Sequence, residues 1–174
     1  MNKCCLVKPN STDENAIHNL MERWKIFGGR MNPGLLWHFD GNYFEWLRYL
    51  TNWENGIDIG EEVPQTLFLL KRDDGAILGA VSIRHYLNHT NIIDGGHLGY
   101  GICPEFRGFG YGDIILKLAL KKLLEMGIEK VLVTCDFDNY ASQKVILNNG
   151  GVLENQALDE DGITVNRYWI DNTK

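Results

Sequence analysis

The clearest absence in this 174-residue sequence is clustered positive charge. The chain has 17 basic against 23 acidic residues, carries a net charge of −6 and contains no Lys/Arg-rich run. A nucleic-acid-binding surface needs clustered basic side chains, so we expect no nucleic-acid partner. No apolar stretch is long enough to cross a bilayer, and the apolar run at the N-terminus is too short for a signal peptide. We therefore expect no membrane partner.

Cysteine is also scarce, with four residues at Cys4, Cys5, Cys103 and Cys135. They form no CxxC pair and no Cys/His set with zinc spacing, so we expect no metal site. Cys103 and Cys135 lie in apolar, strand-like segments, which favours a role as small buried hydrophobic residues over a redox role. We expect the chain to work in a reducing, cytoplasmic environment.

The bulk composition favours a single domain over residues 1–174. Apolar residues make up 44% of the chain and charged residues 23%, which is ordinary for a globular protein. This length allows one full hydrophobic core and leaves little room for a second. No internal repeat or low-complexity segment is present.

Hydrophobic periodicity and turn residues predict a mixed succession of strands and helices. Strands are expected at residues 6–7, 66–70, 76–85, 97–103, 129–137, 152–153 and 165–170. Helices are expected after a capping box of Ser11 and Glu14, and at residues 43–53, 114–126 and 139–148. This order predicts a mixed α/β sheet with helices on both faces. The strands at 97–103 and 129–137, joined through a helix, should be parallel.

A glycine-rich loop joins the strand at 97–103 to the next helix, at residues 107–112. The first N–H groups of a helix have no partner inside the helix, and glycines allow the backbone to approach a ligand closely, so such a loop suits an anion. A Walker A loop would need a Lys and a Ser or Thr that are missing here, and the GxGxG spacing is a poor match to a dinucleotide fingerprint. A plain strand-to-helix connection is the alternative.

Residues 104–112 resemble the coenzyme A pyrophosphate loop of the GNAT superfamily of N-acetyltransferases. Arg107, Gly110 and Gly112 match that family's pattern. The segment from Asn139 to Gly150 resembles the family's last helix and the glycine after it, and the order of elements agrees over essentially the whole chain. Its end departs from the usual Gly-Phe, and Ile146 stands where many relatives carry a general-acid tyrosine.

The resemblance implies a GNAT-like, mostly antiparallel sheet of about six to seven strands, with a splayed parallel pair at the cofactor site. It also implies acetyl-coenzyme A as the cosubstrate. Glycines inside the strand at 97–103 support a close backbone approach there. The residues expected to bind the cofactor are Ile102, Cys103, Arg107, Gly108, Phe109, Gly110, Tyr111, Gly112, Asn139 and Ser142.

The implied reaction is direct transfer of an acetyl group to an amine held in the same complex. His97 is the candidate general base, because an imidazole titrates near neutral pH; the alternative is a histidine that only hydrogen-bonds within the sheet. Tyr140, or else Tyr100, is the candidate acid that reprotonates the thiolate. Trp37 and His38 precede a helix with an apolar stripe and could line an acceptor pocket.

The acceptor itself stays open at this stage, as a small-molecule or peptide amine. The rival function is a non-catalytic module that senses acyl-coenzyme A, which would need the same loop but no base. A homodimer is an arrangement that the family resemblance allows.

Overall fold

The computed structural model describes residues 3–173, which form seven strands and four α-helices. The strands are β1 (Cys4–Val7), β2 (Gln65–Arg72), β3 (Ile77–Arg84), β4 (Leu98–Ile102), β5 (Lys130–Asp136), β6 (Val152–Leu158) and β7 (Thr164–Asp171). The helices are α1 (Glu14–Phe27), α2 (Tyr43–Asn55), α3 (Tyr111–Glu125) and α4 (Tyr140–Asn148). The predicted mixed α/β, mostly antiparallel fold is confirmed.

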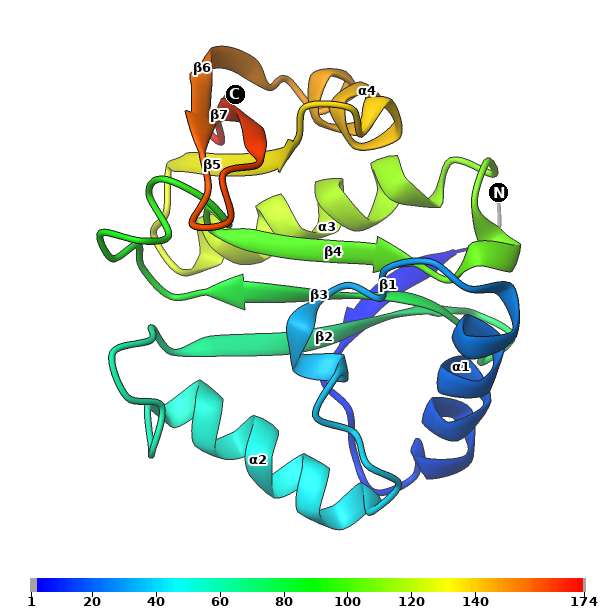
Figure 1. The fold of residues 1–174 in the computed structure, drawn as a ribbon. Coiled ribbons are helices and arrows are strands. Elements are labelled where there is room, and N and C mark those ends of the chain that lie inside the picture. Colours follow the sequence, from blue (N-terminus) through cyan, green and yellow to red (C-terminus); the bar gives the residue numbers. More distant parts are fainter. Residues whose placement is uncertain (1–2, 174) are drawn as a thin grey trace.

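The strands form two antiparallel sheets rather than one continuous ladder. The first sheet has the order β1-β2-β3-β4, and the second has the order β5-β7-β6 (Figure 1). Strands β4 and β5 run in the same direction and lie at the facing edges of the two sheets. The expected splayed parallel pair is therefore the junction between these sheets.

The two sheets are joined at the start of β4. The backbone N–H of His97 donates to the carbonyl of Leu132 at 2.8 Å, and the Leu132 N–H donates to Nδ1 of the His97 ring at 2.9 Å. Gly96 allows this approach, because a Cβ there would lie 2.4 Å from the Leu132 oxygen. Beyond this point no ladder joins β4 to β5 in the described chain, so the strands separate towards their C-terminal ends.

Helices cover both faces of the first sheet, as the sequence predicts. Figure 1 shows α1 and α2 on one side and α3 on the other, with α4 beside α3. Each face has its own apolar core: Trp24, Trp46 and Leu69 are buried on the α1–α2 side, and Ile115, Leu116 and others on the α3 side. Burial of these large side chains supplies the main free energy that holds the layers together.

Two local predictions are corrected. Ser11 does not cap α1, since the helix starts at Glu14 and no side chain caps its N-terminus. The neighbouring Asp13 instead accepts hydrogen bonds from Asn10 and from Lys71 Nζ at 2.9 Å, which ties the helix start to β2. Helix α3 also begins earlier than predicted, at Tyr111, so the end of the glycine loop is already helical.

Within the described residues, no helix is both long and apolar enough to cross a membrane.

The close contact of β3 with β4 generates a prediction about stability. A Cβ at Gly79 would lie 2.2 Å from the Gly101 oxygen, whereas a Cβ at Gly99 would have only Pro33, at 3.9 Å, within reach. We expect Gly79→Ala to lower the free energy of unfolding by about 2 kcal/mol, as overpacking does. Gly99→Ala, the matched control, should change it by less than about 1 kcal/mol. Urea denaturation measures both, and equal losses would contradict this packing.

Candidate active site

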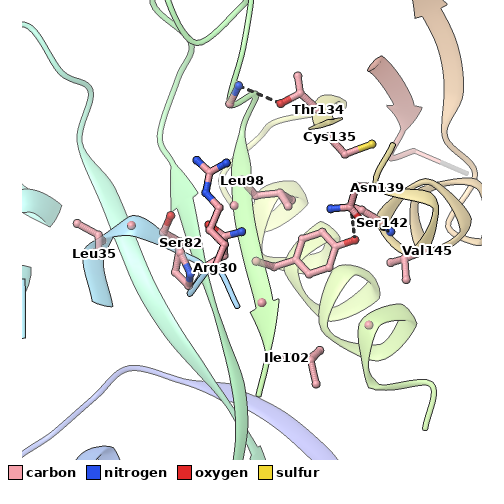
Figure 2. Close-up of a pocket in the computed structure, with 18 of the residues that line it drawn as sticks. Arg30, Leu35, Ser82, Leu98, Ile102, Thr134, Cys135, Asn139, Ser142 and Val145 are labelled. Atoms are coloured by element: carbon pink, nitrogen blue, oxygen red, sulfur yellow. Dashed lines mark hydrogen bonds between the residues drawn. The ribbon is translucent and has the colours of Figure 1, made fainter. Parts of the chain in front are cut away.

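A cavity of about 970 Å³ opens where β4 and β5 separate. Figure 2 shows β4 running through its middle. Cys135, Asn139, Ser142 and Val145 line the cavity on the side of β5 and α4, and Arg30, Leu35 and Ser82 line it on the other side. The cavity therefore has two lobes separated by one strand, and each lobe can hold a different molecule.

The glycine loop forms the outer end of the β5–α4 lobe. Gly108 and Gly110 have φ angles of +83° and +81°, which disfavour residues with a Cβ. Nothing lies within 4 Å of the Cβ positions of either residue, so the loop surface is open. Gly110 immediately precedes the first turn of α3, whose N–H groups and dipole favour an anion.

Most of the residues predicted to bind the cofactor meet at this cavity. Its lining includes Ile102, Arg107, Gly108, Gly110, Gly112, Asn139 and Ser142. Arg107 donates from Nε to the Ile102 carbonyl at 3.0 Å, so the terminal nitrogens of its guanidinium stay available to a ligand. Gly112 also has a packing role, because a Cβ there would lie 2.8 Å from Val145 on α4.

Three of the predicted cofactor residues lie outside the lining of the cavity. Cys103 is fully buried in the α1–α2 core, and Phe109 is 70% exposed at the tip of the loop. Tyr111 is turned towards β2, where its hydroxyl accepts a hydrogen bond from Arg72 at 3.3 Å. Any role of these three in binding stays a prediction, and their backbone groups rather than their side chains would carry it.

A hydrogen-bond chain crosses the β5–α4 lobe from β4 to the start of α4. Asn139 caps α4 by accepting from the Ser142 N–H at 3.1 Å. The hydroxyl of Ser142 bonds that of Tyr100, on β4, also at 3.1 Å. Burial raises the pKa of Tyr100 to about 12, so its phenol is protonated at neutral pH. By contrast, Tyr140 is 72% exposed and does not line the cavity.

His97 lies at the junction of the sheets, outside the lining of the cavity. Its side chain is buried, and its Nδ1 already accepts the hydrogen bond from Leu132. Burial lowers the pKa of His97 to about 4, with the charge of Arg84 acting in the same direction. A base with this pKa takes up protons weakly at neutral pH. The surroundings thus match the structural alternative, while a role in proton transfer stays a prediction.

The other lobe contains polar residues that sequence reasoning did not select. Gln65, Ser82 and Arg84 line it from the paired strands β2 and β3. The sequence gives only a weak signal for these residues, because it shows no more than polar residues at strand ends and polar residues two positions apart in an apolar run. Trp37 and His38 line the same cavity, as expected of an acceptor pocket.

No group of three or more His, Cys, Asp or Glu side chains in residues 3–173 is placed to hold a metal ion.

The buried histidine generates a pH prediction. The pKa of His97 is about 4 in the fold and 6.5 ordinarily, so the unfolded chain binds more protons between these values. Its contribution to stability is therefore complete above pH 6.5 and is lost as pH falls towards 4, by up to about 3 kcal/mol. His97→Asn keeps an acceptor for the Leu132 N–H but cannot titrate. Denaturation experiments between pH 7 and pH 4 should show a smaller loss of unfolding free energy in the variant than in the wild-type protein. Equal losses in the two proteins would refute the assignment.

Comparison with known proteins places this geometry in a family. The chain matches the acetyltransferase (GNAT) domain family over residues 3–152. No curated protein matches it significantly.

Several solved structures share the fold. A mutant spermidine/spermine N-acetyltransferase, SpeG, from Vibrio cholerae has 18% identity and a TM-score of 0.66, covering 99% of this chain and 96% of its own. The microcin C7 self-immunity acetyltransferase MccE, in complex with acetyl-CoA and AMP, has 19% identity and a TM-score of 0.66, covering 97% and 92%. A putative ribosomal-protein-serine acetyltransferase from Vibrio cholerae has 16% identity and a TM-score of 0.65, covering 98% and 95%. With the open glycine loop and the gap between β4 and β5, the family match identifies the chain as a member of the GNAT acetyltransferase family and thus as an acyltransferase.

Proposed function

We propose that the protein transfers an acetyl group from acetyl-coenzyme A to the amine of a small molecule or a peptide, in one complex that holds both. The observation that supports this most directly is the continuity of the cavity. One space runs from the glycine loop past β4 to Ser82 and Arg84. A donor on one side and an acceptor on the other would be held together, which is the main source of rate in such a transfer.

The cosubstrate fits the residues of the β5–α4 lobe. Arg107 and the backbone of Gly108 and Gly110 would hold the pyrophosphate, because guanidinium and N–H groups at a helix start favour phosphate oxygens. The facing edges of β4 and β5 carry no strand partner within residues 3–173. These edges can hydrogen-bond the amides of the pantetheine arm as an added strand would.

In the reaction, the amine nitrogen forms a bond to the thioester carbonyl carbon, and the carbon–sulfur bond breaks. The amine loses a proton and the leaving thiolate gains one. We place Tyr100 as the proton donor, since its phenol is protonated, lines the cavity and bonds Ser142. Tyr140 is the alternative donor, and His97 or a water molecule would accept the proton of the amine.

The loop assignment predicts a loss of cosubstrate affinity in Gly110→Asp. A carboxylate beside the pyrophosphate repels it, and the Cβ disfavours the loop conformation, so the Kd for acetyl-coenzyme A should rise at least about tenfold. Gly162→Asp is the matched control, because Gly162 has φ +76° and open space but lies in the β6–β7 turn. Isothermal titration calorimetry measures both variants.

Two outcomes of this titration would count against the proposal. Unchanged affinity in Gly110→Asp would remove the loop assignment. Tight binding by the wild-type protein without thiol release, across a panel of amines, would favour the acyl-coenzyme A sensor instead.

The choice of proton donor predicts different effects at two tyrosines. Tyr100→Phe should lower kcat about 100-fold, as loss of a general acid does, and leave the Kd for acetyl-coenzyme A nearly unchanged. Tyr140→Phe should leave both nearly unchanged. Steady-state thiol release together with calorimetry tests the pair. The reverse pattern would assign the donor to Tyr140.

A further inference from the structure

The lobe of the cavity opposite the glycine loop has a polar floor. Gln65 on β2 is the register partner of Arg84 on β3, and Ser82 lies two residues before Arg84. Side chains two residues apart on a strand point to the same face, so these groups converge on one surface. Gln65 is 8% exposed and Ser82 2% exposed, although both line the cavity. Polar groups placed at the floor of a pocket can fix the orientation of a ligand.

Arg84 is the charged member of this floor and is held in place. Its Nη1 donates to the carbonyls of Gly95 at 2.9 Å and Gly96 at 3.0 Å, which fixes the plane of the guanidinium. Its Nε is buried and has no hydrogen-bond partner among the described residues. Burial lowers the pKa of Arg84, although an arginine keeps its charge in proteins.

No carboxylate forms an ion pair with Arg84 in residues 3–173. Asp94 and Glu62 are near enough to favour its charged form, and both line the cavity. Asp94 already accepts hydrogen bonds from the Gly95 N–H and from Thr134. The lobe thus presents a guanidinium that has no ion-pair partner and lies near two carboxylates, an arrangement that complements a molecule carrying both charges.

The nature of the anion follows from this balance. A carboxylate carries one negative charge and matches a single guanidinium, which can donate a charge-assisted hydrogen bond from an N–H that Gly95 and Gly96 do not use. A phosphate monoester is close to doubly charged and would meet the repulsion of Asp94 and Glu62. A polyamine carries only positive charges, so it could pair with Asp94 and Glu62 but would leave Arg84 without a partner.

The position of Arg84 also limits the size of the acceptor. Ser82 pairs with Gly99, on the strand that separates the two lobes. Arg84 lies two residues further along β3, a distance of about 7 Å along the strand. A carboxylate at Arg84 therefore lies within a few bonds of an amine that reaches past Ser82 to β4.

We propose that the acceptor is an amine that carries a carboxylate a few bonds away, as an amino acid does, and that Arg84 and Ser82 bind this carboxylate. This inference rests on the proposed acetyl transfer and specifies its substrate class. Arg84 is a specificity residue in this scheme, and the chemistry itself belongs to the groups around β4.

Matched substrate pairs test the proposal by thiol release from acetyl-coenzyme A. Each amino acid in a panel is compared with its carboxamide and with the amine left when the carboxylate is removed, and spermidine and aminoethyl phosphate complete the panel. Dipeptides are added to the panel to distinguish two sources of the carboxylate. One source is a free amino acid, and the other is an acidic side chain next to the N-terminus of a peptide. We expect kcat/KM to be at least about tenfold higher for the preferred carboxylate than for its uncharged partners.

Substitutions at Arg84 and Ser82 test whether the floor of the lobe causes the preference for a carboxylate. Arg84→Met should bring the ratio of kcat/KM between carboxylate and carboxamide substrates close to one, with Arg84→Lys restoring part of it. Ser82→Ala removes only one hydroxyl and should reduce the ratio in a fold that is otherwise intact. Arg48→Met is the matched control, because Arg48 is exposed on α2 and is not among the residues that line the cavity, and it should retain the full ratio.

The outcomes separate this inference from the function on which it depends. Acetylation of amines with no preference for a carboxylate, or a preference for spermidine or the phosphate, would overturn the inference and leave the transferase intact. A carboxylate preference that survives in both Arg84→Met and Ser82→Ala would also overturn it. Absence of transfer to every amine, with acetyl-coenzyme A still bound, would refute the proposed function itself. If Arg84→Met no longer binds acetyl-coenzyme A, its fold is damaged and Ser82→Ala decides.

Discussion

The architecture depends on the pair of hydrogen bonds between His97 and Leu132. They join two antiparallel sheets at the start of β4, next to the hydrogen bonds of Gly95 and Asp94 with Thr134 on β5, and the facing strands diverge from there. A neutral, buried imidazole suits this position because its Nδ1 must keep a free lone pair for the Leu132 N–H. A fully paired sheet would close the gap, and separate sheets would leave it without a fixed width. One fixed junction gives an opening of defined geometry.

The two lobes of that opening have different chemistry because they are built from different layers. The first is closed by the glycine loop and the start of α3, where backbone N–H groups dominate. The second is floored by side chains of β2 and β3 and covered by the segment before α2. Only the thin wall of β4 separates them. Gly101 keeps this wall thin, since a Cβ there would lie 2.4 Å from the Asn32 oxygen.

The fold offers a physical explanation for the departures from the family pattern. Ile146, which the sequence resemblance predicts at the position of the relatives' acid, is completely buried in the core between α4 and the sheets. On the β5–α4 side of the cavity, Tyr100 lines the space from β4 and reaches α4 through Ser142. A phenol can thus lie beside α4 in this chain without being part of α4.

The sequence alone determined the order and type of the elements, because apolar periodicity and glycine position are local properties. It also located the glycine loop, whose backbone needs residues such as Gly110 wherever the chain leads next. Only the tertiary structure decided that His97 is enclosed between two sheets, that Tyr140 faces solvent, and that Gln65, Ser82 and Arg84 share one floor. These outcomes depend on strand register and on packing between residues distant in sequence. Such contacts leave no periodic trace along the chain.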